Sequence, residues 1–201
     1  MKLNYAAAAL ALMSLPVFGA TITVTNTLGP VGTQSVVDNA GVPVSAGYAA
    51  IGLFDEGALA NLTSGALSDA FTLFDGAQGP LNNAPFSGTF SVQSAGGVPL
   101  DQANPFSGKP IYLVLGNGAD LASSTQTAIL KVGSFGNTEP TLATVNVRAG
   151  DIAAADILWG DNTSFQFSGR PTIALAPVIP EPSSSLLFGV AGLALLIRRK
   201  R

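Results

Sequence analysis

The stretch KPIYLVLGNG (residues 109–118) gives the clearest indication of the fold class. Five apolar residues follow one another from Ile111 to Leu115, and Gly116–Asn117–Gly118 forms a turn signal directly after them. An apolar run of this length beside turn residues is typical of a β-strand that is buried on both faces. We therefore expect Lys109–Leu115 to be a central strand, with Thr125–Val132 as its hairpin partner across the turn.

Short apolar runs separated by turn residues continue this pattern on both sides. Residues 21–180 contain 20 Gly and 11 Pro, which divide the chain at intervals of roughly ten to fifteen residues, as in all-β domains. The pattern predicts an all-β domain, with a β-sandwich or jelly-roll architecture, over residues 21–177. Further strands are expected at Thr21–Asn26, Gly47–Phe54, Phe86–Val92, Thr141–Val147, Thr163–Phe167 and Thr172–Ala176.

The segment Asp55–Asp75 departs from the strand pattern. Its apolar residues follow helical spacings of three and four: Leu59, Leu62, Leu67, Phe71 and Phe74. We expect a helical insertion of two short helices, the second capped by Ser64 and closed by Gly76. An irregular loop with apolar anchors is the alternative. Ile152–Trp159 fits either a helical turn or a strand.

The first residues of the chain have the order of a secretory signal peptide. Lys2 precedes the largely apolar stretch Tyr5–Val17, and the small residues Gly19 and Ala20 follow it. This stretch is too short for a transmembrane helix. We expect residues 1–20 to form a signal helix that is cleaved after Gly19 or after Ala20. A buried N-terminal helix is the alternative.

The last residues, 178–201, contain three consecutive elements. Pro180–Glu181–Pro182 comes first, the uncharged apolar stretch Leu186–Ile197 follows, and a basic cluster closes the chain: Arg198, Arg199, Lys200 and Arg201. The apolar stretch rises about 18 Å as a helix against a hydrocarbon core of about 30 Å. We expect a short C-terminal transmembrane helix, because Ser183–Ser185 and snorkelling basic side chains extend its reach. Basic residues stay on the cytoplasmic side, so we expect the cluster to act as a membrane stop-transfer signal with the domain outside.

In order and spacing, these elements resemble the PEP-CTERM sorting signal. The resemblance implies export by Sec-type machinery in a Gram-negative-type bacterium whose exosortase recognises the tail. It also implies cleavage near Pro180–Pro182 and transfer from the inner membrane to the cell surface or an extracellular polysaccharide matrix. Two prolines around Glu181 favour extended backbone, which suits a recognition motif. An ordinary C-terminal membrane anchor is the alternative.

Composition excludes several kinds of chemistry. The sequence has no His and no Cys, which removes the Ser–His–Asp triad, cysteine nucleophiles and cysteine-bound metals. Residues 21–180 contain 11 acidic and 4 basic residues, so nucleic-acid binding is disfavoured. The carboxylates lie mostly in polar turns, and no nucleotide-binding motif is present. We therefore expect no catalytic residues, no cofactor site and no enzymatic activity.

Two kinds of ligand stay open as alternatives. Calcium prefers oxygen ligands, and its candidate loops are Asn117–Asp120 and Asp151–Asn162; ordinary Asx-turns would explain both loops equally. A glycan would stack on Trp159, the only Trp, although core packing would also explain this residue. We expect the exported domain to be structural or adhesive within exopolysaccharide, with a carbohydrate-binding module at the cell surface as the alternative.

Overall fold

The computed structural model describes residues 21–26, 36–61, 63–79, 81, 91–93, 105–137, 142–167 and 169–178. This part of the chain is mainly β, with a short α-helix and three 3-10 helices. The elements are β1 (Thr21–Thr25), β2 (Val36–Val37), β3 (Gly47–Phe54), η2 (Glu56–Asn61), α1 (Ser64–Ala70), β4 (Phe71–Gly79), β5 (Ser91–Gln93), β6 (Pro110–Gly116), β7 (Gln126–Ser134), β8 (Leu142–Asn146), η3 (Ala149–Asp151), η4 (Ala154–Asp156), β9 (Ile157–Trp159), β10 (Gln166–Phe167), β11 (Arg170–Pro171), β12 (Ile173–Ala174) and β13 (Ala176–Pro177).

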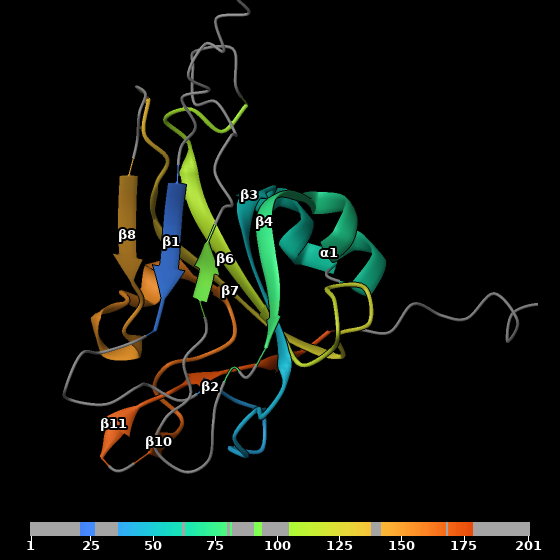
Figure 1. Cartoon of the computed structure of the whole chain (residues 1–201). Helices are drawn as coiled ribbons and strands as arrows, with labels where there is room; N and C mark the ends of the chain where they lie inside the picture. Colours follow the sequence, from blue (N-terminus) through green and yellow to red (C-terminus); the bar gives the residue numbers. More distant parts are fainter. Residues whose placement is uncertain are drawn as a thin grey trace, which may run out of the picture.

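A six-stranded sheet forms the centre of the molecule (Figure 1). Its strands lie in the order β13–β7–β6–β3–β4, and β9 also pairs with β7. β6 and β7 form the antiparallel pair that the sequence predicts, with Leu113 opposite Leu130. On its other side β6 pairs with β3, where Leu113 lies opposite Ile51. The prediction that residues 109–115 form a central strand is confirmed.

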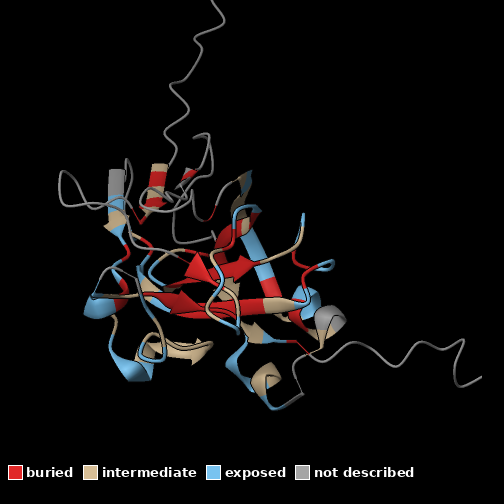
Figure 2. Ribbon diagram, turned by 90° about the horizontal axis from the view of Figure 1, so that it is seen from below, coloured by how far each residue is buried: buried red, intermediate tan, exposed pale blue. Residues whose placement is uncertain are grey.

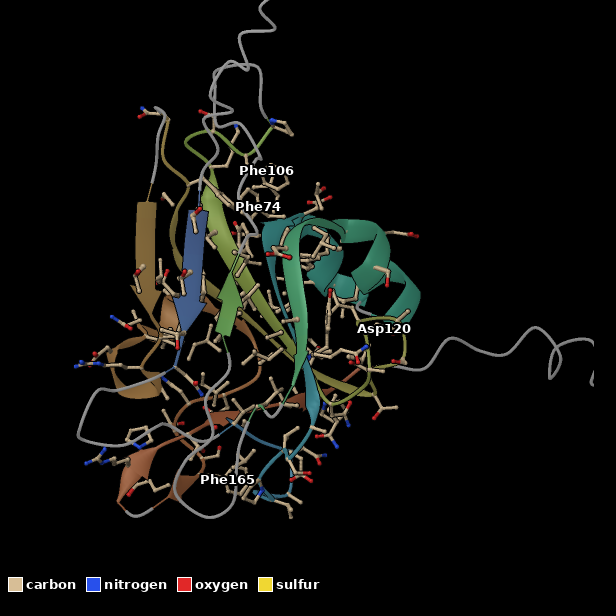
Figure 3. All side chains as sticks on the ribbon, in the orientation of Figure 1. Phe74, Phe106, Asp120 and Phe165 are labelled. Carbon is tan, nitrogen blue, oxygen red and sulfur yellow. The ribbon has the colours of Figure 1, made fainter. Side chains whose placement is uncertain are left out.

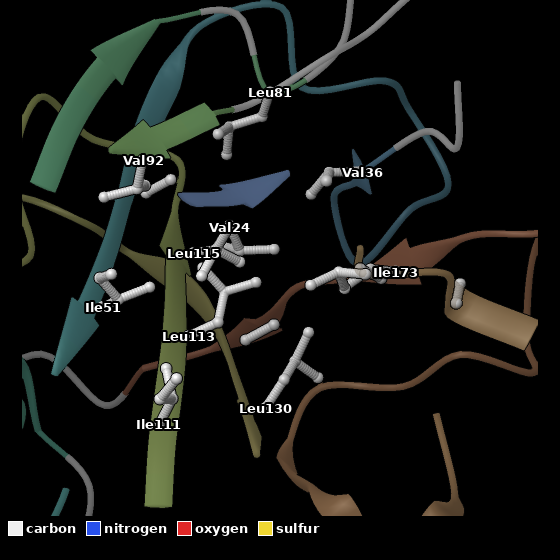
Figure 4. Packing of buried hydrophobic residues seen from close by; sticks show 14 of the residues in the cluster. Val24, Val36, Ile51, Leu81, Val92, Ile111, Leu113, Leu115, Leu130 and Ile173 are labelled. Atoms are coloured by element: carbon white, nitrogen blue, oxygen red, sulfur yellow. The ribbon is translucent and has the colours of Figure 1, made fainter. Parts of the chain in front are cut away.

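Both faces of this sheet are buried, and they belong to two separate hydrophobic clusters. On β6, Ile111, Leu113 and Leu115 belong to the first cluster, whereas Tyr112 and Val114 belong to the second. Successive side chains of a strand point to opposite faces, so a strand between two covered faces is apolar throughout. Figure 2 shows the buried residues gathered in the central strands, and Figure 4 shows the packing of the first cluster.

A three-stranded sheet in the order β5–β1–β8 packs on the first cluster. Ile22 and Val24 of β1 are 0% exposed within this cluster, as the alternation in Thr21–Asn26 predicts. β1 runs antiparallel to β5 but parallel to β8, and β2 and β12 form a second parallel pair. The mainly β class is confirmed. With two parallel pairs, the sheet order does not establish the finer sandwich or jelly-roll architecture.

Two short helices pack on the second cluster at the opposite face (Figure 1). Leu67 of α1 is 0% exposed, and Leu59 of η2 packs against the same cluster. The helical insertion is therefore present. Its second helix is capped by Thr63 rather than Ser64, because the Thr63 hydroxyl oxygen accepts a hydrogen bond of 3.0 Å from the N–H of Ala66.

The prediction that Gly76 closes this helix is wrong, because the helix ends at Ala70 and Phe71–Gly79 forms strand β4. Phe71 is buried in the second cluster, whereas Phe74 packs against the first. The pairing of β4 with β3 shifts between Ile51 and Gly52, and Phe74 is the unpaired residue of the resulting β-bulge. Residues three positions apart point to opposite faces of a strand, as Phe71 and Phe74 do, so their spacing does not indicate a helix here.

The bulge places Phe74 in an aromatic cluster with Phe106 and Phe135. The ring centroids are 5.1 Å apart for Phe74 and Phe106, and 4.9 Å apart for Phe74 and Phe135. Figure 3 labels the first of these pairs. The N–H of Lys109 donates a hydrogen bond to the carbonyl of Phe106, and the carbonyl of Lys109 accepts one from the N–H of Phe135. The aromatic cluster therefore lies where β6 begins and β7 ends.

The strands near the C-terminus are shorter than predicted. Thr163–Phe167 is a strand only at Gln166–Phe167, and a non-strand residue divides Thr172–Ala176 between β12 and β13. Ile152–Trp159 contains both of the expected alternatives, since η4 is followed directly by β9. The predicted strand Phe86–Val92 lies mostly outside the described residues, apart from its end in β5.

The signal helix at residues 1–20 and the C-terminal transmembrane helix also lie outside the described residues. Within the described ranges, no helix is both long and apolar enough to cross a membrane.

Candidate functional site

The last described residue before Pro180, Val178, is tied into the central sheet. β13 pairs antiparallel with β7, where Ala176 lies opposite Thr127. The N–H of Val178 then donates to the carbonyl of Thr125 at 2.9 Å, and Val178 is only 3% exposed. These contacts therefore place Val178 in the sheet, two residues before Pro180. A cut at or after Pro180 leaves these contacts in place.

The first candidate calcium loop, Asn117–Asp120, lies in the connection between the end of β6 and the start of β7. The Asn117 Oδ1 accepts hydrogen bonds from the N–H groups of Thr125 and Gln126 at 2.9 and 3.0 Å. Asp120, labelled in Figure 3, accepts a bond of 2.7 Å from the N–H of Ser123. Hydrogen bonding to Ser123, chiefly to its side chain, lowers the pKa of Asp120. These oxygens therefore hold the turn together, as the Asx-turn alternative predicts.

The second candidate loop, Asp151–Asn162, is divided among η3, η4 and β9. Asp161 accepts hydrogen bonds from the N–H groups of Thr163 and Ser164 at 2.9 and 2.8 Å. A further hydrogen bond to the Ser164 side chain has the largest effect on the pKa of Asp161. Together with the backbone bonds, it holds this pKa far below its ordinary value. Among the residues that the structure describes, no group of three or more acidic side chains gathers to hold a metal ion.

Trp159 lies in β9 opposite Ile129 of β7 and is half-buried. Its side chain packs against the second cluster. The indole Nε1 is buried and has no hydrogen-bond partner among the described residues. Packing therefore occupies part of the ring, and only the remainder is open to a sugar.

A hydrogen bond that the sequence pattern did not indicate joins the helices to the sheet. The Tyr112 hydroxyl on β6 donates to the Glu56 carboxylate on η2 at 2.6 Å. Burial, followed by this bond, raises the pKa of Tyr112 to about 12. Glu56 is therefore engaged in holding η2 against the sheet.

Residues 178–201 match the PEP-CTERM protein-sorting motif. The match includes the predicted sorting residues Pro180, Glu181 and Pro182 and the closing basic cluster Arg198–Arg201, all of which lie outside the described residues. The chain is therefore an exported protein that is sorted to the cell surface and depends on exosortase as its processing partner. No curated protein and no solved structure matches the chain. The motif assigns no function to residues 21–177.

Proposed function

We propose that residues 21–177 form a structural or adhesive domain that is held within exopolysaccharide at the cell surface or in the extracellular matrix. The sorting motif at residues 178–201 carries this proposal. The N–H of Val178 makes its bond to Thr125 where the sorting motif begins. A cut near Pro180–Pro182 therefore leaves this bond in the delivered domain.

The delivery follows from the order of the elements along the chain. Sec-type machinery exports the chain and the signal peptide is removed. Leu186–Ile197 then holds the domain at the outer side of the inner membrane, while Arg198–Arg201 stays cytoplasmic. Exosortase cuts near Pro180–Pro182 and releases the domain to the surface. In this sequence of events Pro180, Glu181 and Pro182 are recognised by another enzyme.

The hydrogen bonds of the aspartates support a role without catalysis. One carboxylate oxygen of Asp38 accepts bonds from the N–H groups of Ala40 and Val42, both at 2.8 Å. Asp55 accepts a bond of 2.9 Å from the N–H of Gly57. These carboxylates, like those of Asp120 and Asp161, stabilise turns of their own chain.

Fractionation of cells that produce the full chain tests the proposal. We expect the domain in the washed extracellular matrix, from which it is released when the polysaccharide is broken down. The matched variant with both Pro180→Ala and Pro182→Ala should stay in the membrane fraction. Recovery of the wild-type domain from the culture medium alone, or from the membrane alone, would contradict a role in the matrix.

A further inference from the structure

A groove of about 370 Å³ lies beside the last residues of β7. This volume falls within the range of roughly 300–1,000 Å³ that is usual for small-ligand sites. β7 forms one wall, the end of β8 forms another, and residues of η3 and η4 complete the lining. The polar side chains that line it are Lys131, Ser134, Asn146, Arg148, Asp151 and Asp156.

The groove runs along the edge of a strand. Residues 131–134 of β7 all line it, although successive side chains point to opposite faces of a sheet. The pairing of β7 with β6 passes from Lys131 to Gly133, so Val132 forms a β-bulge that brings neighbouring residues to one side of the strand. β6 pairs with the other edge as far as Ser134, whereas β9 pairs on the groove side only as far as Leu130. In the described chain, this edge therefore offers backbone groups to a ligand.

The groove sets two cations beside two carboxylates, Asp151 and Asp156, in an acidic domain. Residues 21–180 have four basic residues, and two of them, Lys131 and Arg148, line it. The Arg148 Nε lies 3.7 Å from the Asp151 carboxylate, and the two side chains are 52% and 70% exposed. An exposed pair of this kind contributes at most about 1 kcal/mol, so Arg148 is available to a ligand. Lys131 is exposed and forms no ion pair within the described ranges.

The geometry points to this groove as a binding site for an acidic sugar of a polysaccharide, an inference that rests on the proposed place of the domain in exopolysaccharide. The sugar carboxylate accepts hydrogen bonds from Lys131 and Arg148. The guanidinium group of Arg148 can donate two parallel hydrogen bonds to one carboxylate. The Asp156 carboxylate and the Asn146 amide bind ring hydroxyls. A neutral sugar leaves Lys131 without an anionic partner and Arg148 with Asp151 alone. Trp159 does not line the groove, so this site differs from the one that the sequence suggested.

Calorimetric titration of the full chain in detergent tests the site with two probes, an oligomer of galacturonic acid and a galactose oligomer of equal length. We expect the acidic oligomer to bind and the neutral one not to saturate. Lys131→Gln and Arg148→Gln should each weaken binding by about tenfold or more, as expected for the loss of a charge-assisted hydrogen bond.

Lys109→Gln is the matched control, because it removes the same charge from an exposed lysine that does not line the groove. Screening limits its effect to less than about twofold. The three replaced side chains are exposed, so all three variants should keep the wild-type melting temperature.

Three results would overturn the inference: no binding of the acidic oligomer, equal binding of the neutral one, or equal weakening by Lys109→Gln. Binding of an extended peptide in place of the sugar would overturn it as well. None of these results alters processing of the tail, so the proposed function is judged separately by the fractionation. Shortening of the acidic oligomer during titration would support the site but contradict the absence of enzymatic activity.

Discussion

Replacement of Leu113 by alanine tests whether the central sheet is held by packing on its first face. Leu113 lies in the middle of β6 and is 0% exposed. The substitution removes three carbon atoms, and at about 0.8 kcal/mol for each the loss of transfer free energy is about 2.4 kcal/mol. The cavity left between Ile51 and Leu130 adds to this. We therefore expect the free energy of unfolding to fall by about 3–4 kcal/mol.

Urea unfolding measures this loss, with the fluorescence of Trp159 as the probe because the chain has 1 Trp. Leu73→Ala is the matched control, since Leu73 lies on β4 of the same sheet but is 52% exposed. Its effect should stay within about 0.5 kcal/mol. A loss below about 1 kcal/mol for Leu113→Ala, or equal losses at the two positions, would refute the packing assigned to β6.

Three further predictions concern the bulge and two titrating groups. Gly52→Ala should lower the free energy of unfolding by about 1–3 kcal/mol, because the added Cβ meets the carbonyl of Thr72; unchanged urea unfolding would contradict this. The pKa of Asp161 is lowered in the folded state, so its stabilisation is present above the unfolded pKa of about 3.9 and is lost as the pH falls further. Asp161→Ala should therefore lower the melting temperature at neutral pH but not in strong acid, and a difference that is independent of pH would contradict the assignment. The pKa of Tyr112 is raised to about 12, so its stabilisation is complete below the unfolded value of about 10 and is lost as the pH rises through 12. Ultraviolet titration should show a late tyrosinate step that Tyr112→Phe removes, and a wild-type chain without that step would contradict the bond to Glu56.

The central strands were predictable because their apolar pattern reports burial directly. The uninterrupted run Ile111–Leu115 needs a cover on both faces, and the structure supplies both. Alternation in Thr21–Asn26 likewise predicted one buried face for β1. The partners of β1 could not be predicted in this way. Its parallel pairing with β8 joins Thr21 to Leu142, and no local pattern encodes a contact over that separation.

Phe74 shows where periodicity misleads. Spacings of three and four residues from Leu67 to Phe74 fit a helix, but the helix ends at Ala70 and the remaining residues enter a bulged strand. The pairing with β3 decides the outcome, because β4 gains hydrogen bonds and side-chain contacts along that edge. Local propensity could not indicate where the change from helix to strand occurs.

The two candidate sites differ in how much the sequence reveals. The sorting motif is a short linear stretch, so its residues, Pro180–Pro182 and Arg198–Arg201, were found by inspection and match a known motif. The groove depends on Lys131 and Arg148, which come from β7 and from the chain after β8. The only hint of it in the sequence was the scarcity of basic residues in the domain.

Mass spectrometry of the protein recovered from the cell surface tests the central claim most directly. The claim is that the tail that follows Val178 is a processed sorting signal. We predict a protein that has lost Leu186–Arg201 and ends near Pro180–Pro182. A surface protein that still ends in Arg198–Arg201 would contradict the account.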